Sequence, residues 1–532
     1  MADVDTVLAL RRRLKRTWVP FFARFGRLLP IQIAAIPPIL DGRNVVVASP
    51  TASGKTEAVV APVAENLLRS DVSGLVAIYV SPTRALVNDT EVRCAEPLSE
   101  VGISCTVKTG DRPQFQPARP ANFVITTPES LDSILCRFPA ALETLQAVIL
   151  DELHLLDKTY RGDQLRLLLR RIASTTLSPA LRVYALSATL GAADEVASRY
   201  MQDFVVVETP GQREIDYTPH TSLSEVLRVA RTQGIRKLLM FANSRRKVEE
   251  TAADLGELFP ARKVVTHHGS LSKQKREEAE QFMRESPIGI CVATTTLEIG
   301  IDIGDIDAVV LVDPPWSVSS LLQRVGRGNR RSGVARALAV YTSEAERLAY
   351  DRLIALARAG AVGSDPYEAD LSVVVQQIFS LLFGSPRGLE TEQLWSYFEG
   401  FCAREEWEAI VRHLQAGDLV ERRGERWYAS TQVMDMGEKG RLHSNIPDRS
   451  ARKVVDATSG QVVGEVADIV DEVFALGGRM WQTTEDRGPV IYARPARRAS
   501  MAPIFRTHQP RGAFFRYLPD AVKRGYTKRG AG

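Results

Sequence analysis

Short apolar runs alternate with longer segments of mixed polarity over the first 345 residues of the chain. Residues 45–48, 123–126 and 147–150 are the clearest of these runs. Strands that are apolar along their whole length are typical of parallel sheets that helices cover on both faces. The runs therefore predict buried parallel strands, and residues 238–244 open a second set of strands and helices.

The pattern changes beyond this part of the chain. Apolar residues recur with helical spacing over 371–383, 388–398 and 404–416, and residues 419–428 are expected to form a hairpin that turns at Gly424. Three helices followed by a hairpin describe a winged helix. Residues 435–510 contain several strand-like runs and predict a β-rich region. Trp481 in that region is a candidate for stacking on a nucleic-acid base, and a buried tryptophan that anchors the region is the alternative.

Residues 49–56 read Ser-Pro-Thr-Ala-Ser-Gly-Lys-Thr and lie between a predicted strand and a helix-compatible segment. Strand, loop and helix in this order are the context of a phosphate-binding loop, in which backbone N–H groups and a lysine hold phosphates. The strict pattern has glycine where this chain has Ser49, so a helix N-terminus capped by Ser or Thr stays open as an alternative. The candidate nucleotide-binding residues of this loop are Thr51, Ala52, Ser53, Gly54, Lys55 and Thr56.

The segment Asp151-Glu-Leu-His154 directly follows the apolar run 147–150. A carboxylate at the end of a strand suits Mg²⁺, and the adjacent acid Glu152 is placed to polarise an attacking water. A nucleoside triphosphatase needs both the phosphate loop and this carboxylate pair. Together they predict a nucleoside triphosphatase that uses Mg²⁺.

Further motifs follow in a fixed order: Ser81-Pro-Thr-Arg-Ala-Leu86, Thr127-Pro-Glu-Ser130, Ser187-Ala-Thr189, His267-His-Gly-Ser270, residues 293–302 and Gln323-Arg-Val-Gly-Arg-Gly-Asn-Arg330. In this order they resemble the motifs of superfamily 2 helicases, which are DEAD/DEAH-box-like motors, over roughly residues 15–345. Within that superfamily the chain most resembles the Lhr (large helicase-related) family of bacterial and archaeal DNA helicases. Its Thr-Ala-Ser-Gly-Lys loop is also similar to that of Mrf-type repair helicases.

The resemblance implies an α/β fold with two tandem RecA-like parallel-sheet domains, a winged helix and a small β-rich C-terminal domain. The expected boundaries are 1–210 for the ATP-binding domain, 211–365 for the second RecA-like domain, 366–432 for the winged helix and 433–532 for the β-rich domain with a basic tail. Lhr chains usually continue for several hundred residues more, so the chain resembles a shortened member.

The same resemblance implies the roles of the site residues. Lys55 would contact the phosphates of ATP, and Thr56 and Asp151 would hold Mg²⁺. Glu152 would be the catalytic base. Residues expected around the nucleotide are Gln32 at the adenine, Asp302 at the ribose, Arg327 and Arg330 at the γ-phosphate, and Gly300, Gln323 and Arg324 beside them. Trp18, Phe21, Phe22 and Phe25 are nearby stacking candidates, with core packing as the alternative for Gln32 and for these aromatic residues.

A strand-binding floor is implied in each RecA-like domain. Its members in the first domain would be Pro82, Thr83, Arg84, Thr109, Gly110, Thr127 and Pro128, and in the second Ser244, Arg245, His268, Gly269, Thr294 and Thr295. Hydroxyl, backbone N–H and guanidinium groups suit phosphate contacts, which carry no sequence information. Isolated Thr-Gly or Thr-Pro pairs are also common turns and helix caps. Ser187 and Thr189 would relay the nucleotide state between the domains.

Composition adds limits to this picture. The 532 residues exceed a single core and carry a net charge of only +4. Residues 481–532 nevertheless hold 11 Lys and Arg against three acids, a local surplus of +8 that is interleaved with aromatic residues. Five dispersed cysteines without C-x-x-C spacing favour a reducing cytoplasm and argue against a zinc or iron–sulfur site. We expect neither a membrane span nor a signal peptide.

Two functions from different classes remain open. The first is an ATP-dependent helicase that moves 3′ to 5′ on single-stranded DNA and separates DNA or RNA–DNA duplexes in DNA repair. The second is a clamp or remodeller that needs a protein partner within a larger repair or anti-phage assembly. An RNA helicase is a weaker third possibility, because DEAD-box proteins have Asp where this chain has His154.

Overall fold

The computed structural model describes residues 4–49, 53–69, 73–179, 181–188, 193–209, 214–258, 264–298, 303–328, 334–359, 367–447, 451–467, 473–476, 479–486, 490–496 and 511–523. The candidates Thr51, Ala52, Thr189, Gly300, Asp302 and Arg330 lie outside the described residues. The chain divides into two compact units. The first contains 1–210, 365–448 and 509–532, and the second contains 211–364 and 449–508.

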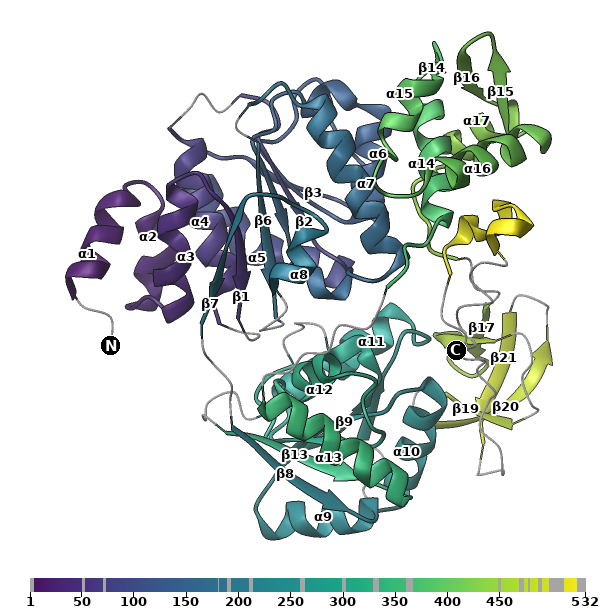
Figure 1. Ribbon diagram of the computed structural model, residues 1–532. Helices are drawn as coiled ribbons and strands as arrows, with labels where there is room; N and C mark the ends of the chain where they lie inside the picture. The colour runs from purple at the N-terminus through teal and green to yellow at the C-terminus, as the bar shows by residue number, and fades with distance from the viewer. Residues whose placement is uncertain are drawn as a thin grey trace. The chain divides into compact units, whose positions relative to one another are not determined.

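The first unit is built on a seven-stranded parallel sheet with the order β3-β4-β2-β5-β6-β1-β7 (Figure 1). Its strands are β1 Asn44–Ala48, β2 Ala77–Val80, β3 Cys105–Lys108, β4 Phe123–Thr126, β5 Ala147–Leu150, β6 Arg182–Ser187 and β7 Phe204–Glu208. Every apolar run that the sequence singled out in this region is a strand, so the prediction of a buried parallel sheet is confirmed.

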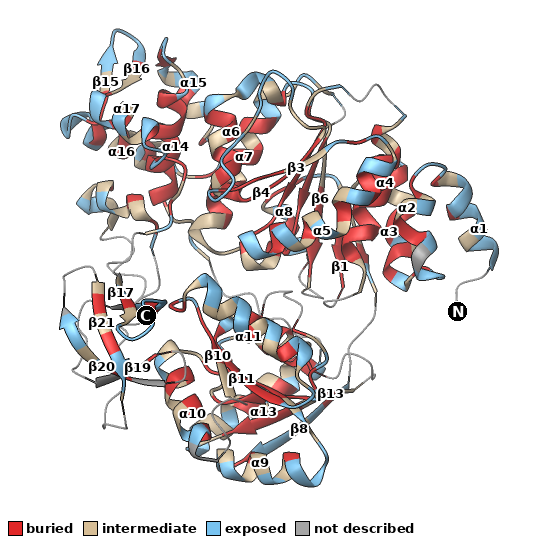
Figure 2. Cartoon of the chain, turned by 180° about the vertical axis from the view of Figure 1, so that it is seen from behind, coloured by how far each residue is buried: buried red, intermediate tan, exposed pale blue. Residues whose placement is uncertain are grey.

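Alternate residues of each buried strand point to opposite sides of the sheet, and both sets are apolar. Helices therefore cover both faces of the sheet. Val45 and Ile149 face one apolar core, and Val46 and Val148 face the other. The helices are α1 Val4–Arg13, α2 Trp18–Phe22, α3 Pro30–Leu40, α4 Lys55–Leu67, α5 Arg84–Glu100, α6 Pro128–Arg137, α7 Tyr160–Thr175 and α8 Ala193–Ser198. Figure 2 shows the strands buried between these layers.

The second unit holds a six-stranded sheet of the order β10-β11-β9-β12-β13-β8, again parallel throughout. Its strands are β8 Glu214–His220, β9 Lys237–Phe241, β10 Val264–His267, β11 Gly289–Ala293, β12 Ala308–Leu311 and β13 Val334–Val340. Its helices are α9 Leu223–Thr232, α10 Arg245–Leu258, α11 Lys273–Glu285, α12 Val318–Val325 and α13 Glu344–Arg358. The expected pair of RecA-like α/β domains is therefore present.

An accessory module of the first unit follows the second sheet in sequence. It contains α14 Ser372–Phe383, β14 Leu389–Glu390, α15 Thr391–Ser396, α16 Arg404–Ala416, β15 Val420–Arg423, β16 Arg426–Ala429 and α17 Thr431–Glu438. The hairpin β15–β16 turns at Gly424, which has a φ of 61°. These elements are those expected for the third part of the chain, and their assignment as a winged helix stays a prediction.

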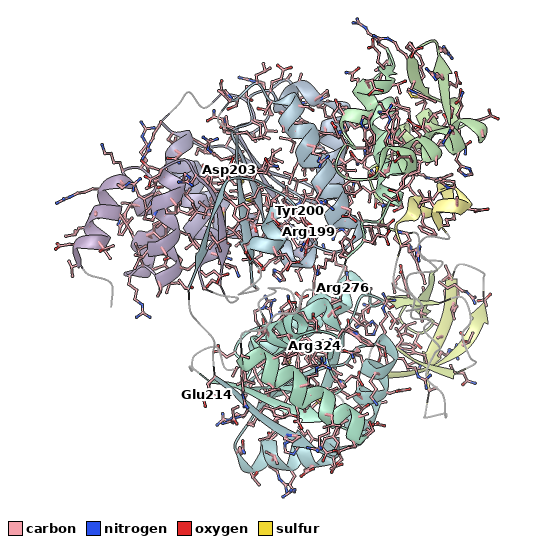
Figure 3. All side chains as sticks on the ribbon, in the orientation of Figure 1. Arg199, Tyr200, Asp203, Glu214, Arg276 and Arg324 are labelled. Atoms are coloured by element: carbon pink, nitrogen blue, oxygen red, sulfur yellow. The ribbon has the colours of Figure 1, made fainter. Side chains whose placement is uncertain are left out.

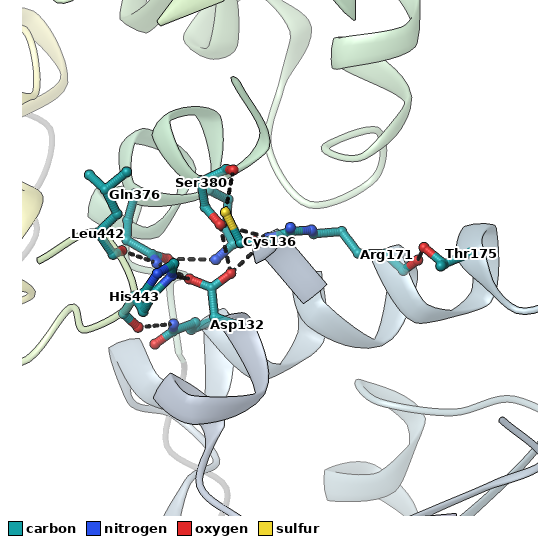
Figure 4. Close-up of polar contacts among 10 residues, drawn as sticks. Asp132, Cys136, Arg171, Thr175, Gln376, Ser380, Leu442 and His443 are labelled. Carbon is teal, nitrogen blue, oxygen red and sulfur yellow. Dashed lines mark hydrogen bonds and ion pairs between the residues drawn. The ribbon is translucent and has the colours of Figure 1, made fainter. Parts of the chain in front are cut away.

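A buried polar network joins this module to helices α6 and α7 (Figure 4). Asp132 of α6 is fully buried and accepts hydrogen bonds from Arg171 of α7 at 2.7 Å and from Gln376 of α14 at 2.7 Å. Ser380 of α14 donates a third, at 2.8 Å. Burial by itself would raise the pKa of Asp132, but His443 and Arg171 hold it below its usual value.

The C-terminal region departs from the single β-rich domain expected over 433–532. A short helix at Ala513–Tyr517 returns to α14, where the rings of Phe514 and Phe379 lie 5.9 Å apart. Phe514 and Leu518 are buried in the same core as α14. Residues 431–438 form α17, which packs there as well. Apolar residues within the basic tail account for this docking, so residues 511–523 are part of the first unit.

The β-domain proper is a five-stranded sheet in the second unit with the order β18-β17-β21-β20-β19. Its strands are β17 Ala451–Asp456, β18 Val462–Ala467, β19 Val473–Leu476, β20 Arg479–Asp486 and β21 Val490–Pro495. Trp481 is only 4% exposed, and its indole N–H donates to the Leu476 carbonyl at 2.7 Å. The proposal that Trp481 stacks on a base is therefore wrong, and the anchoring tryptophan is correct. No described helix is long and apolar enough to cross a membrane.

Candidate active site and nucleic-acid interface

The predicted phosphate loop ends at the N-terminus of α4, directly after β1. Gly54 has a φ of 81°, and a Cβ there would lie 2.6 Å from Nε2 of Gln32. Both the backbone angle and the space therefore require glycine at this position. Lys55 is buried and donates from Nζ to the Ser49 carbonyl at 2.6 Å. Because α4 begins at Lys55, the N-terminus of this helix directly follows the loop, a position at which helices bind phosphates.

Gln32 supports the phosphate loop from helix α3. Its Oε1 accepts from the Leu29 N–H at 2.8 Å, and its Nε2 donates to the Gly54 carbonyl at 3.3 Å. Its reading of adenine stays a prediction. Phe21 and Phe22 are buried in the core, so for these two the core-packing alternative holds. Phe25 is 51% exposed and remains a stacking candidate.

The two carboxylates follow β5, which lies between β2 and β6 in the sheet. Asp151 accepts a hydrogen bond from the Ser81 hydroxyl at 3.1 Å. Burial and the neighbouring Glu152 raise the pKa of Asp151. A divalent cation at this carboxylate would offset both effects, so the charge environment fits Mg²⁺. Glu152 itself has a φ of 40°, a strained backbone angle of the kind that persists at functional sites.

His154 connects the carboxylates to the Ser187-Ala-Thr motif, a role that the sequence analysis missed. Its Nδ1 accepts the Ala188 N–H at 3.1 Å and lies 3.4 Å from the Ser187 hydroxyl. The same Nδ1 lies 3.5 Å from a carboxylate oxygen of Glu152. Burial, with Lys55 adding to it, lowers the pKa of His154 to about 4, so the imidazole is neutral near pH 7. Its position three residues after Asp151, in a motif already singled out, was the available signal.

The candidate floor residues of the first unit follow β2, β3 and β4. These strands are adjacent and parallel, so the three loops meet at one edge of the sheet. Arg84 is exposed and pairs with Asp111 at 2.6 Å, and Gly110 lies against the same guanidinium. Thr83 caps α5 by accepting the Leu86 N–H at 3.3 Å. The remaining members, Pro82, Thr109, Thr127 and Pro128, are buried.

The floor candidates of the second unit follow β9, β10 and β11, which are also adjacent and parallel. Arg245 donates to the Ser270 hydroxyl, and Ser244 accepts the Lys247 N–H at 3.1 Å. Thr295 is exposed, whereas Thr294 is largely buried.

His268 does not belong to the exposed floor. It is fully buried and contacts the equally buried Glu249 through Nε2 at 2.6 Å. Its Nδ1 accepts the Ser270 N–H at 3.2 Å, so this side chain shapes the loop instead of meeting a strand. Its proposed contact with nucleic acid is therefore wrong as a side-chain contact, and the adjacent Gly269 stays a candidate.

Arg324 lies on helix α12, and Arg327 follows the end of that helix. Arg324 is fully buried and donates from Nε to Glu298 at 2.6 Å and from Nη2 to Asn243 at 2.9 Å (Figure 3). Arg327 donates to the Glu298 carbonyl at 2.6 Å, and Gln323 is 8% exposed. Arg324 therefore holds the second domain together, while the role of Arg327 at the γ-phosphate stays a prediction.

Family models match both sheets in order. The DEAD/DEAH box helicase model matches residues 29–196, and the helicase conserved C-terminal domain matches residues 220–332. The ATP-dependent helicase Lhr-Core of Methanothermobacter thermautotrophicus is 30% identical over 90% of this chain and 63% of its own length. The chain has both domains of a DEAD/DEAH box helicase and is a relative of the Lhr-Core helicases. Its domain pair is that of an ATP-dependent helicase, and it spans less than two thirds of this relative.

Solved structures agree with this assignment. The Lhr helicase of Mycobacterium smegmatis bound to single-stranded DNA and AMP-PNP is 27% identical and has a TM-score of 0.70 over 81% of this chain and 62% of that chain. The helicase MrfA bound to DNA has a TM-score of 0.72 over 91% of this chain and 73% of its own. MrfA is 22% identical, so that likeness shows the fold alone.

Proposed function

We propose that this protein is an ATP-driven translocase that moves 3′ to 5′ on single-stranded DNA and separates DNA or RNA–DNA duplexes, with a role in DNA repair. The observation that carries the proposal is the arrangement of one sheet edge in the first unit. Loops after β1, β5 and β6 form the nucleotide half, and loops after β2, β3 and β4 form the strand half. The hydrogen bond from Ser81 to Asp151 joins the two halves.

In this proposal the nucleotide half binds MgATP. Gly54, Lys55 and the N-terminus of α4 hold the phosphates. Thr56 and Asp151 hold Mg²⁺, which supplies charge neutralisation at the phosphates. Glu152 takes a proton from the attacking water.

Coupling between ATP and the strand needs a path from the chemistry to the floor. The contact of His154 with Ala188 and Ser187 supports such a path, because it ties the segment after β5 to the segment after β6. Arg327 and Arg330 would add positive charge at the γ-phosphate, an effect worth about 10³–10⁵ in rate in other motors.

A second candidate function is that of a clamp or remodeller, which would hydrolyse ATP on DNA and unwind only with a protein partner. The chain spans 63% of the Lhr-Core relative from Methanothermobacter thermautotrophicus, so the activities of that whole protein are proposals for this chain.

The test measures ATP hydrolysis with and without single-stranded DNA or RNA, together with strand displacement on 3′-tailed and 5′-tailed duplexes. Stimulation by DNA with displacement of the 3′-tailed duplex is the expected result, and Glu152→Gln is the inactive control. Stimulation without displacement would favour the clamp. Stimulation by RNA alone would instead indicate an RNA helicase.

A further inference from the structure

A residue of the second motor domain completes the core of the β-domain. Leu271 follows the floor candidates at the end of β10, and its side chain is 4% exposed. It is buried in a cluster whose other members all come from the β-domain: Val454, Val463, Leu476, Trp481, Ile491 and Ala493. The strand-binding loop and the β-domain therefore share one small apolar core.

Backbone contacts extend this junction on both sides of Leu271. Leu271 pairs with Gly464 as an antiparallel bridge, and the Ser272 N–H donates to the Val463 carbonyl at 3.3 Å. The Glu465 N–H donates to the Ser270 carbonyl. A Cβ at Gly464 would collide with that carbonyl and lie 3.1 Å from Cα of Leu271, so only glycine permits this approach.

The motor domain holds the same loop from the other side. His268 accepts the Ser270 N–H at 3.2 Å, and Arg276 of α11 donates to the Leu271 carbonyl at 2.7 Å (Figure 3). Strands β19 and β20 also pack against α10, which begins at the floor candidate Arg245 (Figure 1). The β-domain thus contacts the loop that carries Gly269 and the helix that begins at Arg245.

We propose that the β-domain is a positioning element for strand binding, with Leu271 as the positioning residue that links it to the loop 268–272. This inference rests on the proposed binding of a nucleic-acid strand by the second motor domain. A loop that is ordered before the strand arrives loses less conformational entropy on binding, so its affinity for phosphates rises. The β-domain then acts on the strand without touching it, which accounts for a buried Trp481.

The test uses the full chain and two substitutions that weaken the junction from opposite sides. Leu271→Ala removes the shared side chain, and Gly464→Ala pushes the hairpin away from Ser270. Leu348→Ala and Val462→Ala are the matched controls, since Leu348 is 56% and Val462 is 41% exposed in the same unit. Leu271→Met keeps an apolar side chain of similar volume and serves as the rescue variant.

The readouts are the Kd for a fluorescent oligo-dT strand, the basal rate of ATP hydrolysis, and amide hydrogen exchange over residues 268–272. We expect the Kd of both junction variants to rise about tenfold, because the binding-competent loop is populated less often. Exchange in the loop should accelerate, basal hydrolysis should stay within about twofold, and Leu271→Met and the controls should match the parent.

Two results would overturn the inference. One is faster exchange in the loop with an unchanged Kd, which would mean that loop order does not matter for strand binding. The other is loss of basal hydrolysis in Leu271→Ala, which would mean that the junction maintains the motor fold. Failure of the parent protein to bind or respond to DNA would instead refute the proposed function, and the exchange data would still report on the junction.

Discussion

The two motor sheets repeat one arrangement of residues at the edges that carry the proposed strand-binding residues. Arg84 and Arg245 each lie four residues beyond the end of a strand, β2 or β9, and each begins the following helix. In each domain the guanidinium lies against a glycine of the loop after the outermost strand. A Cβ would approach Nη2 to 2.8 Å at Gly110 and to 3.4 Å at Gly269. The repetition supports the proposal that both domains contact phosphates through the same kinds of group.

The domains differ one strand further in. Asp151, which follows β5, accepts a hydrogen bond from the Ser81 hydroxyl and is adjacent to Glu152 in the sequence. Asp313, which follows the corresponding strand β12, accepts a hydrogen bond from the backbone N–H of Asn243 at 2.8 Å. A carboxylate that accepts a backbone N–H shapes a loop, whereas a buried pair of carboxylates needs a cation. The same strand order therefore places a candidate catalytic carboxylate pair in the first domain and a loop-stabilising carboxylate in the second.

The largest expected effect is on the rate of ATP hydrolysis, and it distinguishes Glu152 from Asp313. Glu152→Gln should lower ATP hydrolysis by about 10²–10⁴-fold, because the general base is lost while the shape is kept. Asp313→Asn should leave the hydrolysis rate at saturating DNA within a few-fold of the parent. Steady-state hydrolysis with oligo-dT measures both, and retained binding of an ATP analogue by Glu152→Gln serves as the folding control. Equal losses in both variants would refute the division of roles.

The attachments of the two domains also differ, and stability measurements sharpen that contrast. The first domain holds its accessory module through the fully buried Asp132, whereas the second holds the β-domain through the apolar Leu271. Asp132→Ala leaves Arg171 buried without its charge partner, which typically costs about 3–5 kcal/mol. Thermal unfolding should show a correspondingly earlier transition. Glu392→Ala removes an exposed ion pair with Arg404 in the same module and should leave the unfolding transition nearly unchanged.

The pH dependence has a definite sign. The pKa of Asp132 is lower in the folded protein than in the unfolded chain, where it is about 3.9. Its stabilising effect is therefore fully present only above that pH. That effect is lost as the pH falls through the folded value, while Leu271 contributes nothing that titrates. The parent should therefore lose stability below about pH 4 in part through this site, and Asp132→Ala should show a weaker dependence there.

The sequence predicted the sheets well for a physical reason. Buried parallel strands such as 45–48 and 147–150 are apolar throughout, and the motifs sit at their ends, where local order alone carries the signal. It failed where the answer depends on distant partners. The burial of His268 requires Glu249, and the burial of Trp481 requires Leu271. No local sequence pattern predicts that residues 511–523 pack on α14.

A smaller effect compares the two arginines of the repeated arrangement. Arg84 is paired with the exposed Asp111, and Arg245 donates to the Ser270 hydroxyl. Arg84→Ala and Arg245→Ala should each weaken oligo-dT binding by up to about tenfold, the range for loss of a phosphate contact. Kd values at two salt concentrations, with Arg246→Ala on the exposed side of α10 as the control, measure this. An unchanged Kd in either variant would remove that arginine from the proposed floor.

The smallest expected effect is a gain. Arg84 and Asp111 lie 2.6 Å apart, with side chains 59% and 62% exposed, so the pair is weak and the acid offsets a charge that would otherwise meet a phosphate. Asp111→Asn keeps the side-chain shape and removes the negative charge, and we expect oligo-dT to bind about two- to fivefold more tightly at low salt. The gain should shrink as the ionic strength rises, because both groups are exposed to solvent. It should also vanish in the Arg84→Ala background, since Asp111 then has no arginine to neutralise. A gain that survives in the double variant would mean that Asp111 repels the strand directly instead of neutralising the charge of Arg84. The first floor would then differ from the second by this repulsion.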